Sequence, residues 1–333
     1  MKAIQVEQVG GPEVLKFEDI APIEEPGPGQ AVVRVVAAGV NFMDINQRRG
    51  SYPREVPFTP GAEGAGVVES VGEGATNVRP SDRVAFTGVP GAYAEAIVVD
   101  ASRLIPLPDD FTFEQGAAFP LQGITAHYLI HEFRAIKPGD FVLVHAAAGG
   151  VGGLLVQWAR HLGATVIGTT SSEEKARTAR EAGAEHVIVY TDEDFVAETK
   201  RITSGHGADL IIDGVGRSTF KGDLDAVAIR GQIVIFGASS GPADPISPNA
   251  LMGRAVSVSG GSLQNFIRTR EELLRRANDV IAGIREGWLK LNIGAVLPLE
   301  QADEAHKLLE SRKTVGKVVL LVAASSQAAG SGA

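Results

Sequence analysis

The sequence contains no cysteine among its 333 residues, and this absence removes several kinds of chemistry. Disulfide bonds, thiolate nucleophiles and thiolate-bound metal ions are all excluded. No stretch has the length and hydrophobicity of a membrane-spanning helix, and residues 1–10 have the pattern of an amphipathic strand rather than the apolar core of a signal peptide. We therefore expect a cytoplasmic protein that does not associate with membranes.

Positive charge is scarce as well. The chain has 31 Lys and Arg residues against 40 Asp and Glu residues, a net charge of -9, and no run of Lys and Arg forms a basic patch. Because nucleic-acid binding needs a basic surface, we expect no nucleic-acid partner. Hydrophobic residues make up 44% of the chain and charged residues 21%, which is typical of a soluble globular protein, and the length favours two domains.

Strand and helix patterns divide the chain at about residue 120. Before it, short Val-rich runs alternate with Gly and Pro clusters, which predicts a β-rich domain with irregular turns. These runs are residues 31–40, 64–71, 83–87 and 93–99. From about residue 123, strands alternate with helices, which predicts an α/β domain with a parallel sheet and helices on both faces. The strands expected there are residues 141–146, 164–169, 186–190, 208–213, 232–236 and 255–259.

The C-terminal part does not continue this alternation. The elements expected there are helices 269–286 and 300–312 and strands 291–297 and 315–322. We expect them to return to the first domain or to pack where the two domains meet. Residues 323–333 are rich in Ala, Ser and Gly, which predicts a disordered tail.

A glycine-rich turn is the most informative local motif. Residues 141–152 run from an apolar strand into a turn, and a helix pattern follows at once in residues 153–160. Ala147, Gly149 and Gly152 fill the three small-residue positions of the dinucleotide fingerprint, with Gly150 and Val151 between them. A tight turn before a helix N-terminus suits a pyrophosphate. The pattern predicts dinucleotide binding, and an ordinary tight strand-to-helix turn is the alternative.

The residues after the second strand bear on the choice of cofactor. NAD-specific domains usually place an Asp or Glu there to bind the ribose 2′-hydroxyl, but this chain has Thr169-Thr-Ser-Ser172. Glu173 and Glu174 lie in the first turn of the next helix, where the helix dipole and a capping box between Ser171 and Glu174 account for them.

Several motifs occur together in one order along the chain. They are Gly39–Asp44 (GVNFMD), Pro60–Gly66 (PGAEGAG), Asp82–Val84 (DRV), Gly123–Tyr128 (GITAHY), Ala146–Gly152 (AAAGGVG) and Leu309–Gly316 (LESRKTVG). From Met1 to about Val322, the chain resembles the zinc-independent, ζ-crystallin-like quinone oxidoreductases of the medium-chain dehydrogenase/reductase superfamily.

This resemblance implies a division into domains. Residues 1–122 and 263–322 would form a GroES-like catalytic domain, and residues 123–262 would form a Rossmann domain with a doubly wound parallel sheet that binds NADPH. It also implies a homodimer.

The resemblance implies roles for residues around the cofactor. Lys175 would meet the 2′-phosphate of NADPH, with Ser171, Tyr190 and Arg312 nearby, although a solvated helix lysine is the alternative for Lys175. Gly237 and Ser240 follow the fifth strand at the edge of the sheet where ligands bind, although they can also be plain loop residues.

Three residues are candidates for the reaction itself. Asn41 and Thr125 match residues that line the nicotinamide end, and Tyr52 would lend its hydroxyl to the developing oxyanion. Asn41 can instead cap its own backbone, and Tyr52, before Pro53, can instead be a packing residue.

Metal-ligand positions are altered. Zinc-using members of the superfamily have a Gly-His-Glu motif, whereas here Ala62 precedes Glu63. His127 and His131 have helical i, i+4 spacing, but the sequence shows no carboxylate or third ligand beside them, so we expect no metal site. Without a Lewis acid, alcohol oxidation loses the group that stabilises the alkoxide, and an acceptor that delocalises negative charge is favoured.

The leading hypothesis is therefore an NADPH-dependent, zinc-free quinone reductase. An α,β-unsaturated aldehyde, a ketone or an enoyl thioester is the alternative acceptor, and a non-enzymatic NADPH- or RNA-binding protein is a third interpretation. Asn46, Gln122 and Gly260-Gly261 depart from better-known family members. The physiological acceptor, the proton donor and the choice between one- and two-electron transfer stay open.

Overall fold

The computed structural model describes residues 1–311 and 314–322, and none of the helices in those ranges is both long and apolar enough to cross a membrane. The chain divides into two compact units. The first contains Met1–Leu121, Thr269–Leu274 and the described residues from Leu291 on, and the second contains Gln122–Arg268 and Arg275–Lys290. Arg312 and the 323–333 tail lie outside the described residues.

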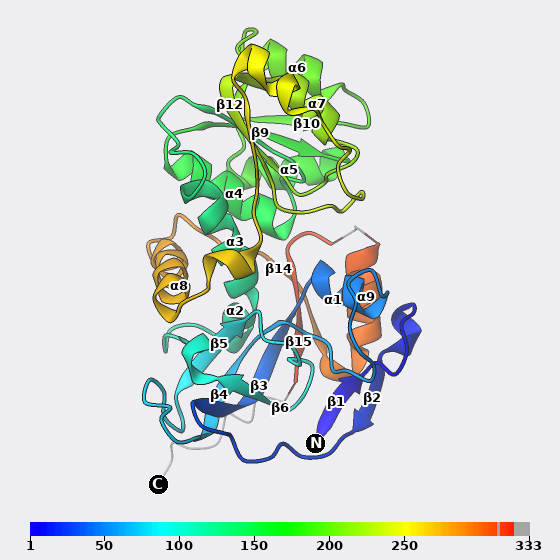
Figure 1. Cartoon of the computed structure of the whole chain (residues 1–333), viewed down its shortest axis with the longest axis vertical. Coiled ribbons are helices and arrows are strands. Elements are labelled where there is room, and N and C mark those ends of the chain that lie inside the picture. The colour runs from blue at the N-terminus through cyan, green and yellow to red at the C-terminus, as the bar shows by residue number, and fades with distance from the viewer. Residues whose placement is uncertain (312–313, 323–333) are drawn as a thin grey trace. The chain divides into compact units, whose positions relative to one another are not determined.

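The first unit is built on a mixed sheet with the strand order β14-β15-β3-β4-β5-β7, in which β6 also pairs with β3 (Figure 1). The strands are β3 (Gln30–Val40), β4 (Glu63–Val71), β5 (Arg83–Thr87), β6 (Ala96–Asp100), β7 (Ile105–Pro106), β14 (Ile293–Pro298) and β15 (Lys317–Leu321). A separate antiparallel ribbon joins β1 (Lys2–Gln5) and β2 (Lys16–Asp19). The predicted β-rich character of the first third is confirmed.

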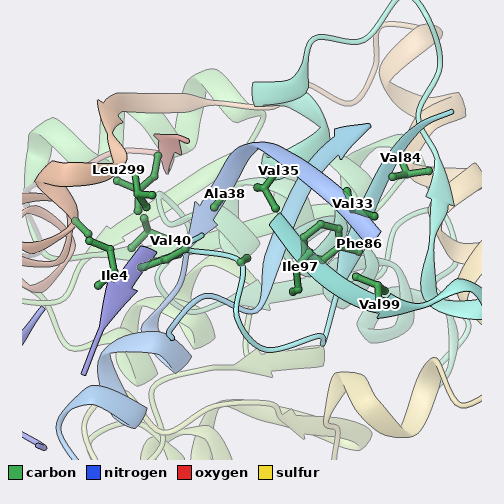
Figure 2. Close-up of a cluster of buried hydrophobic side chains, with 14 of the residues drawn as sticks. Ile4, Val33, Val35, Ala38, Val40, Val84, Phe86, Ile97, Val99 and Leu299 are labelled. Atoms are coloured by element: carbon green, nitrogen blue, oxygen red, sulfur yellow. The ribbon is translucent and has the colours of Figure 1, made fainter. Parts of the chain in front are cut away.

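Apolar side chains from both ends of the chain form the core of this unit. Val33 and Val35 of β3, Phe86 of β5 and Leu299 near the C-terminus lie in one buried cluster, which Figure 2 shows with its neighbours. β15 pairs antiparallel with β3 and parallel with the edge strand β14, so the two C-terminal strands extend the sheet that contains the N-terminal strand β3. The expected return of the C-terminal strands to the first domain is thus observed.

The second unit contains a parallel sheet with the strand order β10-β9-β8-β11-β12-β13. Its strands are β8 (Phe141–Val144), β9 (Thr165–Thr170), β10 (His186–Val189), β11 (Ala208–Asp213), β12 (Val227–Ile235) and β13 (Ser257–Gly260). Its helices α4 (Gly150–His161), α5 (Glu173–Ala182), α6 (Phe195–Ile202) and α7 (Phe220–Ala226) alternate with them. This strand order is that of the doubly wound dinucleotide-binding fold, so the predicted fold class is confirmed.

Helix α8 (Arg270–Arg285) falls mainly in the second unit, whereas the sequence assigned residues 263–322 to the first domain. The reason is its packing against α3 (Pro120–His131): a Cβ atom added to Gly123 would lie 2.7 Å from Val280. The buried Arg276 also forms a 2.6 Å ion pair with Glu132. The remaining helices are α1 (Phe42–Arg48), α2 (Phe113–Ala118) and α9 (Ala302–Glu310).

Candidate functional site

The glycine-rich turn of the second unit has the geometry of an anion site. Ala146 adopts a left-handed conformation with φ of 52°, and its carbonyl accepts a hydrogen bond of 2.8 Å from the N–H of Gly149. A Cβ atom on Gly152 would lie 2.2 Å from the Ala146 carbonyl oxygen, so only glycine fits there. Helix α4 begins at Gly150, which leaves the N–H groups of its first turn available to an anion.

Neighbouring strands hold this turn in place. The N–H of Ala147 donates to the Thr169 carbonyl over 3.1 Å, which ties the turn to β9. A Cβ atom on Gly168 would approach that of Ala147 to 2.7 Å, so the strand and the turn pack with no space for larger side chains. Gln122 covers the start of α4, since a Cβ atom on Gly150 would lie 2.3 Å from its Oε1. Four predicted turn residues, Ala147, Gly149, Gly150 and Gly152, are thus brought together with Val151.

Three of the four residues predicted to meet a 2′-phosphate, Lys175, Ser171 and Tyr190, lie beyond β9, and the fourth, Arg312, lies outside the described residues. Lys175 Nζ donates to Ser171 Oγ over 3.3 Å, and the N–H of Tyr190 donates to the Thr170 carbonyl over 3.0 Å. The capping box expected between Ser171 and Glu174 is wrong. The chain leaves β9 one residue later than expected, so Ser172 caps α5 by accepting from the Lys175 N–H at 3.4 Å.

Gly237 and Ser240 connect two loops at the same edge of the sheet. Ser240 Oγ donates to the Val215 carbonyl over 2.8 Å and accepts from the Ser218 N–H over 3.0 Å. A Cβ atom on Gly237 would lie 2.8 Å from the Gly214 carbonyl oxygen. Both residues therefore join the loop after β12 to the loop after β11.

A buried histidine lies directly before the turn. His145 Nε2 is 2.7 Å from Asp223 Oδ1, and His145 Nδ1 is 2.9 Å from Thr169 Oγ1. Burial raises the pKa of Asp223 to about 6. Burial also acts to lower the pKa of His145, but the carboxylates of Asp223 and Asp213 outweigh it and leave that pKa above its usual value.

In the first unit, Asn41 lies before α1 and is 5% exposed. Its Nδ2 donates to the Gly39 carbonyl at 3.2 Å and to Glu63 Oε2 at 3.0 Å, and its Oδ1 accepts from Lys317 Nζ at 2.7 Å. The backbone N–H of Asn41 donates to Asp44 Oδ2 over 2.8 Å. The Asn41 side chain therefore bonds to Gly39, two residues away, and to Glu63 and Lys317, which are distant in sequence.

Glu63 and Lys317 were not among the predicted site residues. Glu63 is fully buried, and its Oε1 also accepts from the N–H of Leu121 at 2.6 Å. Lys317 is 2% exposed, and its Nζ donates to Glu63 Oε2 at 2.5 Å. The available signal was Lys317, a charged residue within the predicted strand 315–322, where the residues that follow it are apolar.

Asp44 continues this polar cluster away from Asn41. Tyr93 donates its hydroxyl proton to Asp44 Oδ2 over 3.3 Å and lies 3.2 Å from His306 Nε2, while Arg48 donates to His306 Nδ1 over 3.2 Å. Since the Arg48 guanidinium has only donors, His306 carries its proton on Nε2 and donates it to Tyr93. Arg48 also pairs with Glu310 at 2.5 Å.

Burial sets the protonation of this cluster. It raises the pKa of Asp44 to about 7 and, together with the charge of Arg48, lowers the pKa of His306 to about 3. Asp44 Oδ1 has no hydrogen-bond partner within residues 1–311 and 314–322. The Asp44 carboxyl is therefore the group of this cluster that titrates near neutral pH.

Tyr52 and Thr125 differ in exposure. Tyr52 is 50% exposed and follows α1, where its N–H donates to the Asn46 carbonyl over 3.1 Å. Such exposure does not fit a core packing residue. Thr125 is 6% exposed on α3.

Gly261, one of the glycine pair that departs from better-known family members, has a packing role. A Cβ atom on Gly261 would lie 2.7 Å from the Tyr128 ring, and the Gly261 N–H donates to the Ile235 carbonyl over 3.0 Å. A larger side chain would have to displace that ring.

The donors present do not fit a zinc site. Among the residues that the structure describes, no three His, Cys, Asp or Glu side chains are grouped so that they could hold a metal ion. One detail differs from the sequence: a carboxylate does accompany the histidine pair, because Asp279 Oδ2 of α8 lies 2.8 Å from His127 Nε2. Burial lowers the pKa of His127 to about 4, so its imidazole is neutral.

Comparison with known proteins assigns the fold to a family. Residues 27–109 match the alcohol dehydrogenase GroES-like domain, and residues 150–279 match the zinc-binding dehydrogenase domain. A quinone oxidoreductase of Pseudomonas aeruginosa is 41% identical over 323 residues, which cover 96% of this chain and 99% of that protein. The chain belongs to the quinone oxidoreductases of the medium-chain dehydrogenase/reductase superfamily. The resemblance stated from the motifs is thus confirmed.

Two further proteins similar to this chain differ in the activity that their names state. The solved structure of the Escherichia coli quinone oxidoreductase complexed with NADPH has a TM-score of 0.92 and 38% identity, and the match covers 97% of this chain and 100% of that one. A 2-haloacrylate reductase of a Burkholderia species is 39% identical over 328 residues, which cover 96% of this chain and 98% of that protein.

Proposed function

We propose that this protein is an NADPH-dependent, zinc-free quinone reductase. The observation that carries the proposal is the turn from Ala146 to Gly152. This turn leads into the N-terminus of α4, and its tight packing admits only small residues. The full-length similarity to quinone oxidoreductases, one of them bound to NADPH, supports it.

The choice of NADPH rests on the charge beyond β9. Lys175 and Ser171 are hydrogen-bonded there and offer a cation and a hydroxyl to a 2′-phosphate. The nearby Glu173 forms a 2.5 Å ion pair with Arg180, so its carboxylate is already engaged. With Tyr190, and with Arg312 by family resemblance, these residues would hold the adenosine end.

In this proposal, catalysis depends mainly on how the nicotinamide and the acceptor are positioned. Bound NADPH supplies the hydride, and a quinone spreads the resulting charge over its own π-system, so no Lewis acid is needed. Asn41 and Thr125 would orient the nicotinamide end, and the half-exposed Tyr52 would donate its hydroxyl to the oxyanion that forms on the acceptor.

The acceptor has a second candidate class. The similarity to a 2-haloacrylate reductase favours a carbon–carbon double bond conjugated to a carbonyl, which delocalises charge in the same way. Steady-state NADPH oxidation with 1,4-benzoquinone and 9,10-phenanthrenequinone, against a panel of alkenals, 2-haloacrylates and enoyl thioesters, separates the two by kcat/KM. No quinone-dependent rate above background would refute the leading proposal.

Further expectations belong to this proposal. Residues 1–122 and 263–322 would supply the catalytic domain and residues 123–262 the NADPH-binding domain of a cytoplasmic homodimer that binds no nucleic acid. Light scattering tests the dimer, and metal analysis of active protein tests the zinc-free reaction. Salt-dependent RNA binding without NADPH oxidation would instead support a non-enzymatic role.

A further inference from the structure

Three buried polar groups from distant segments meet in the first unit. Lys317 lies beside Asn41 because β15 and β3 pair antiparallel with Val318 opposite Val40. The residue before Val318, Lys317, therefore meets the residue after Val40, Asn41. Glu63 reaches the same point from the start of β4. Burying an ion pair costs several kcal/mol unless its geometry is good, so its presence requires a reason.

The approach of these groups depends on a glycine. A Cβ atom on Gly39 would lie 2.3 Å from the Ala117 carbonyl oxygen, 2.6 Å from Glu63 Oε2 and 2.8 Å from Lys317 Cε. No side chain fits there, and the carbonyl of Gly39 also accepts from Asn41 Nδ2. The backbone is therefore shaped to let the ammonium and the carboxylate close around the Asn41 amide.

This arrangement sets which way the amide faces. Both Nδ2 protons of Asn41 are donated, to Gly39 and Glu63, and one lone pair of its oxygen accepts from Lys317. An amide oxygen has two lone pairs, so the second is the hydrogen-bonding capacity that the side chain keeps. Asn41 can accept a hydrogen bond from a ligand, but it has no proton left to donate.

We propose that Lys317 and Glu63 are positioning residues that fix Asn41 as a hydrogen-bond acceptor, so that the ligand group it meets is a hydroxyl or an amide N–H. The proposal rests on the proposed function in one respect, namely that Asn41 contacts NADPH or the acceptor. The orientation of the amide itself does not depend on any activity.

A charge-neutral double variant tests the proposal. In Lys317→Met/Glu63→Gln, the introduced glutamine keeps the bond to Leu121 and turns its amide protons toward Asn41, so the Asn41 amide reverses to accept them. No buried charge is left unpaired, but the reversed amide no longer donates to the Gly39 carbonyl, so we expect a small decrease in melting temperature. We expect kcat/KM for NADPH to fall about tenfold, the value of one hydrogen bond.

A matched double variant keeps position 41 an acceptor. In Asn41→Asp/Glu63→Gln, the new carboxylate pairs with Lys317 and accepts from the introduced glutamine, and the net charge of the cluster does not change. We expect this variant to lose clearly less kcat/KM for NADPH than Lys317→Met/Glu63→Gln does, because position 41 still accepts a hydrogen bond. Wild-type kcat/KM in the Lys317→Met/Glu63→Gln variant, or an equal loss in both doubles at equal stability, would overturn the proposal.

A second readout does not require turnover. In the ligand-free protein, the side-chain amide protons of Asn41, assigned by their loss in Asn41→Asp/Glu63→Gln, should exchange with solvent at least about tenfold more slowly than in Lys317→Met/Glu63→Gln. Equal exchange rates would overturn the orientation. If the wild type reduced no acceptor, the proposed function would fail while this measurement still decided the orientation.

Discussion

The two units build their candidate sites by different means. The first unit joins charged and polar side chains from distant segments, as in the contact of Lys317 with Glu63 and Asn41. The second unit uses the backbone of one continuous turn, from Ala146 to Gly152, and closes it with atoms too tightly packed to admit a larger side chain. Damage to the first should therefore appear in folding stability, whereas damage to the second should appear in cofactor affinity.

The units also differ in how they neutralise buried carboxylates. In the first unit the buried Glu63 pairs with the ammonium group of Lys317. In the second unit Asp223 pairs with His145, whose charge depends on pH near neutrality. The turn that follows His145 therefore rests on a pair that titrates.

Removal of the cation that pairs with Glu63 should have the largest effect. Lys317→Met leaves Glu63 buried and unpaired, and we expect the free energy of unfolding to fall by about 3–5 kcal/mol in denaturant titrations. Lys307→Met is the control, because Lys307 pairs with Asp303 and Glu304 at the exposed surface, where about 1 kcal/mol or less is expected. Equal losses of unfolding free energy in the two variants would show that the buried ion pair is no more important for stability than the exposed one.

Substitution in the glycine turn should affect binding more than folding. Gly152→Ala places a methyl group 2.2 Å from the Ala146 carbonyl oxygen and must distort the turn, so we expect NADPH affinity to fall about a hundredfold in fluorescence titrations. Gly153→Ala is the control, because its nearest neighbour would be the Ala147 carbonyl oxygen at an ordinary 3.8 Å. Similar affinities for the two variants would show that the turn does not bind the pyrophosphate.

A charge reversal beyond β9 tests the discrimination between cofactors. Lys175→Glu should weaken the binding of NADPH about tenfold to thirtyfold. The affinity for NADH should stay nearly unchanged, because NADH has no 2′-phosphate for the new carboxylate to repel. Arg177→Glu alters an exposed residue of the same helix and should affect both cofactors little. Equal losses for the two cofactors would show that Lys175 does not contact the phosphate.

The smallest expected effect is a change in pH dependence in the first unit. Because burial raises the pKa of Asp44 to about 7, the folded protein holds a proton that the unfolded chain releases near pH 4. Stability due to this group is thus present at low pH and lost as the pH rises through about 7. Asp44→Asn should gain about 1 kcal/mol relative to the wild type between about pH 6 and about pH 8.

A matched exposed carboxylate provides the control. Asp109→Asn in the same unit should show no such trend, since Asp109 is fully exposed. Urea titrations at both pH values check this, and a constant difference between Asp44→Asn and the wild type would show that Asp44 does not retain its proton.

Local sequence patterns predicted much of the fold and part of the candidate site. The glycine turn was predicted because its chemistry lies within one stretch, from Ala147 to Gly152, where small residues have a steric reason. The capping of α5 was predicted one residue too early, since Ser171 and Ser172 both have capping side chains and only the end of β9 chooses between them. The placement of α8 followed from its packing on α3, which no local pattern encodes.

The sequence by itself determined the two kinds of secondary-structure pattern, the dinucleotide turn and the absence of an acidic residue after β9, because each depends on residues close together in the chain. The tertiary structure alone decided that Lys317 lies against Asn41 and Glu63, since the register of β15 on β3 brings together residues far apart in sequence. It thereby decided which hydrogen bond Asn41 has left to offer.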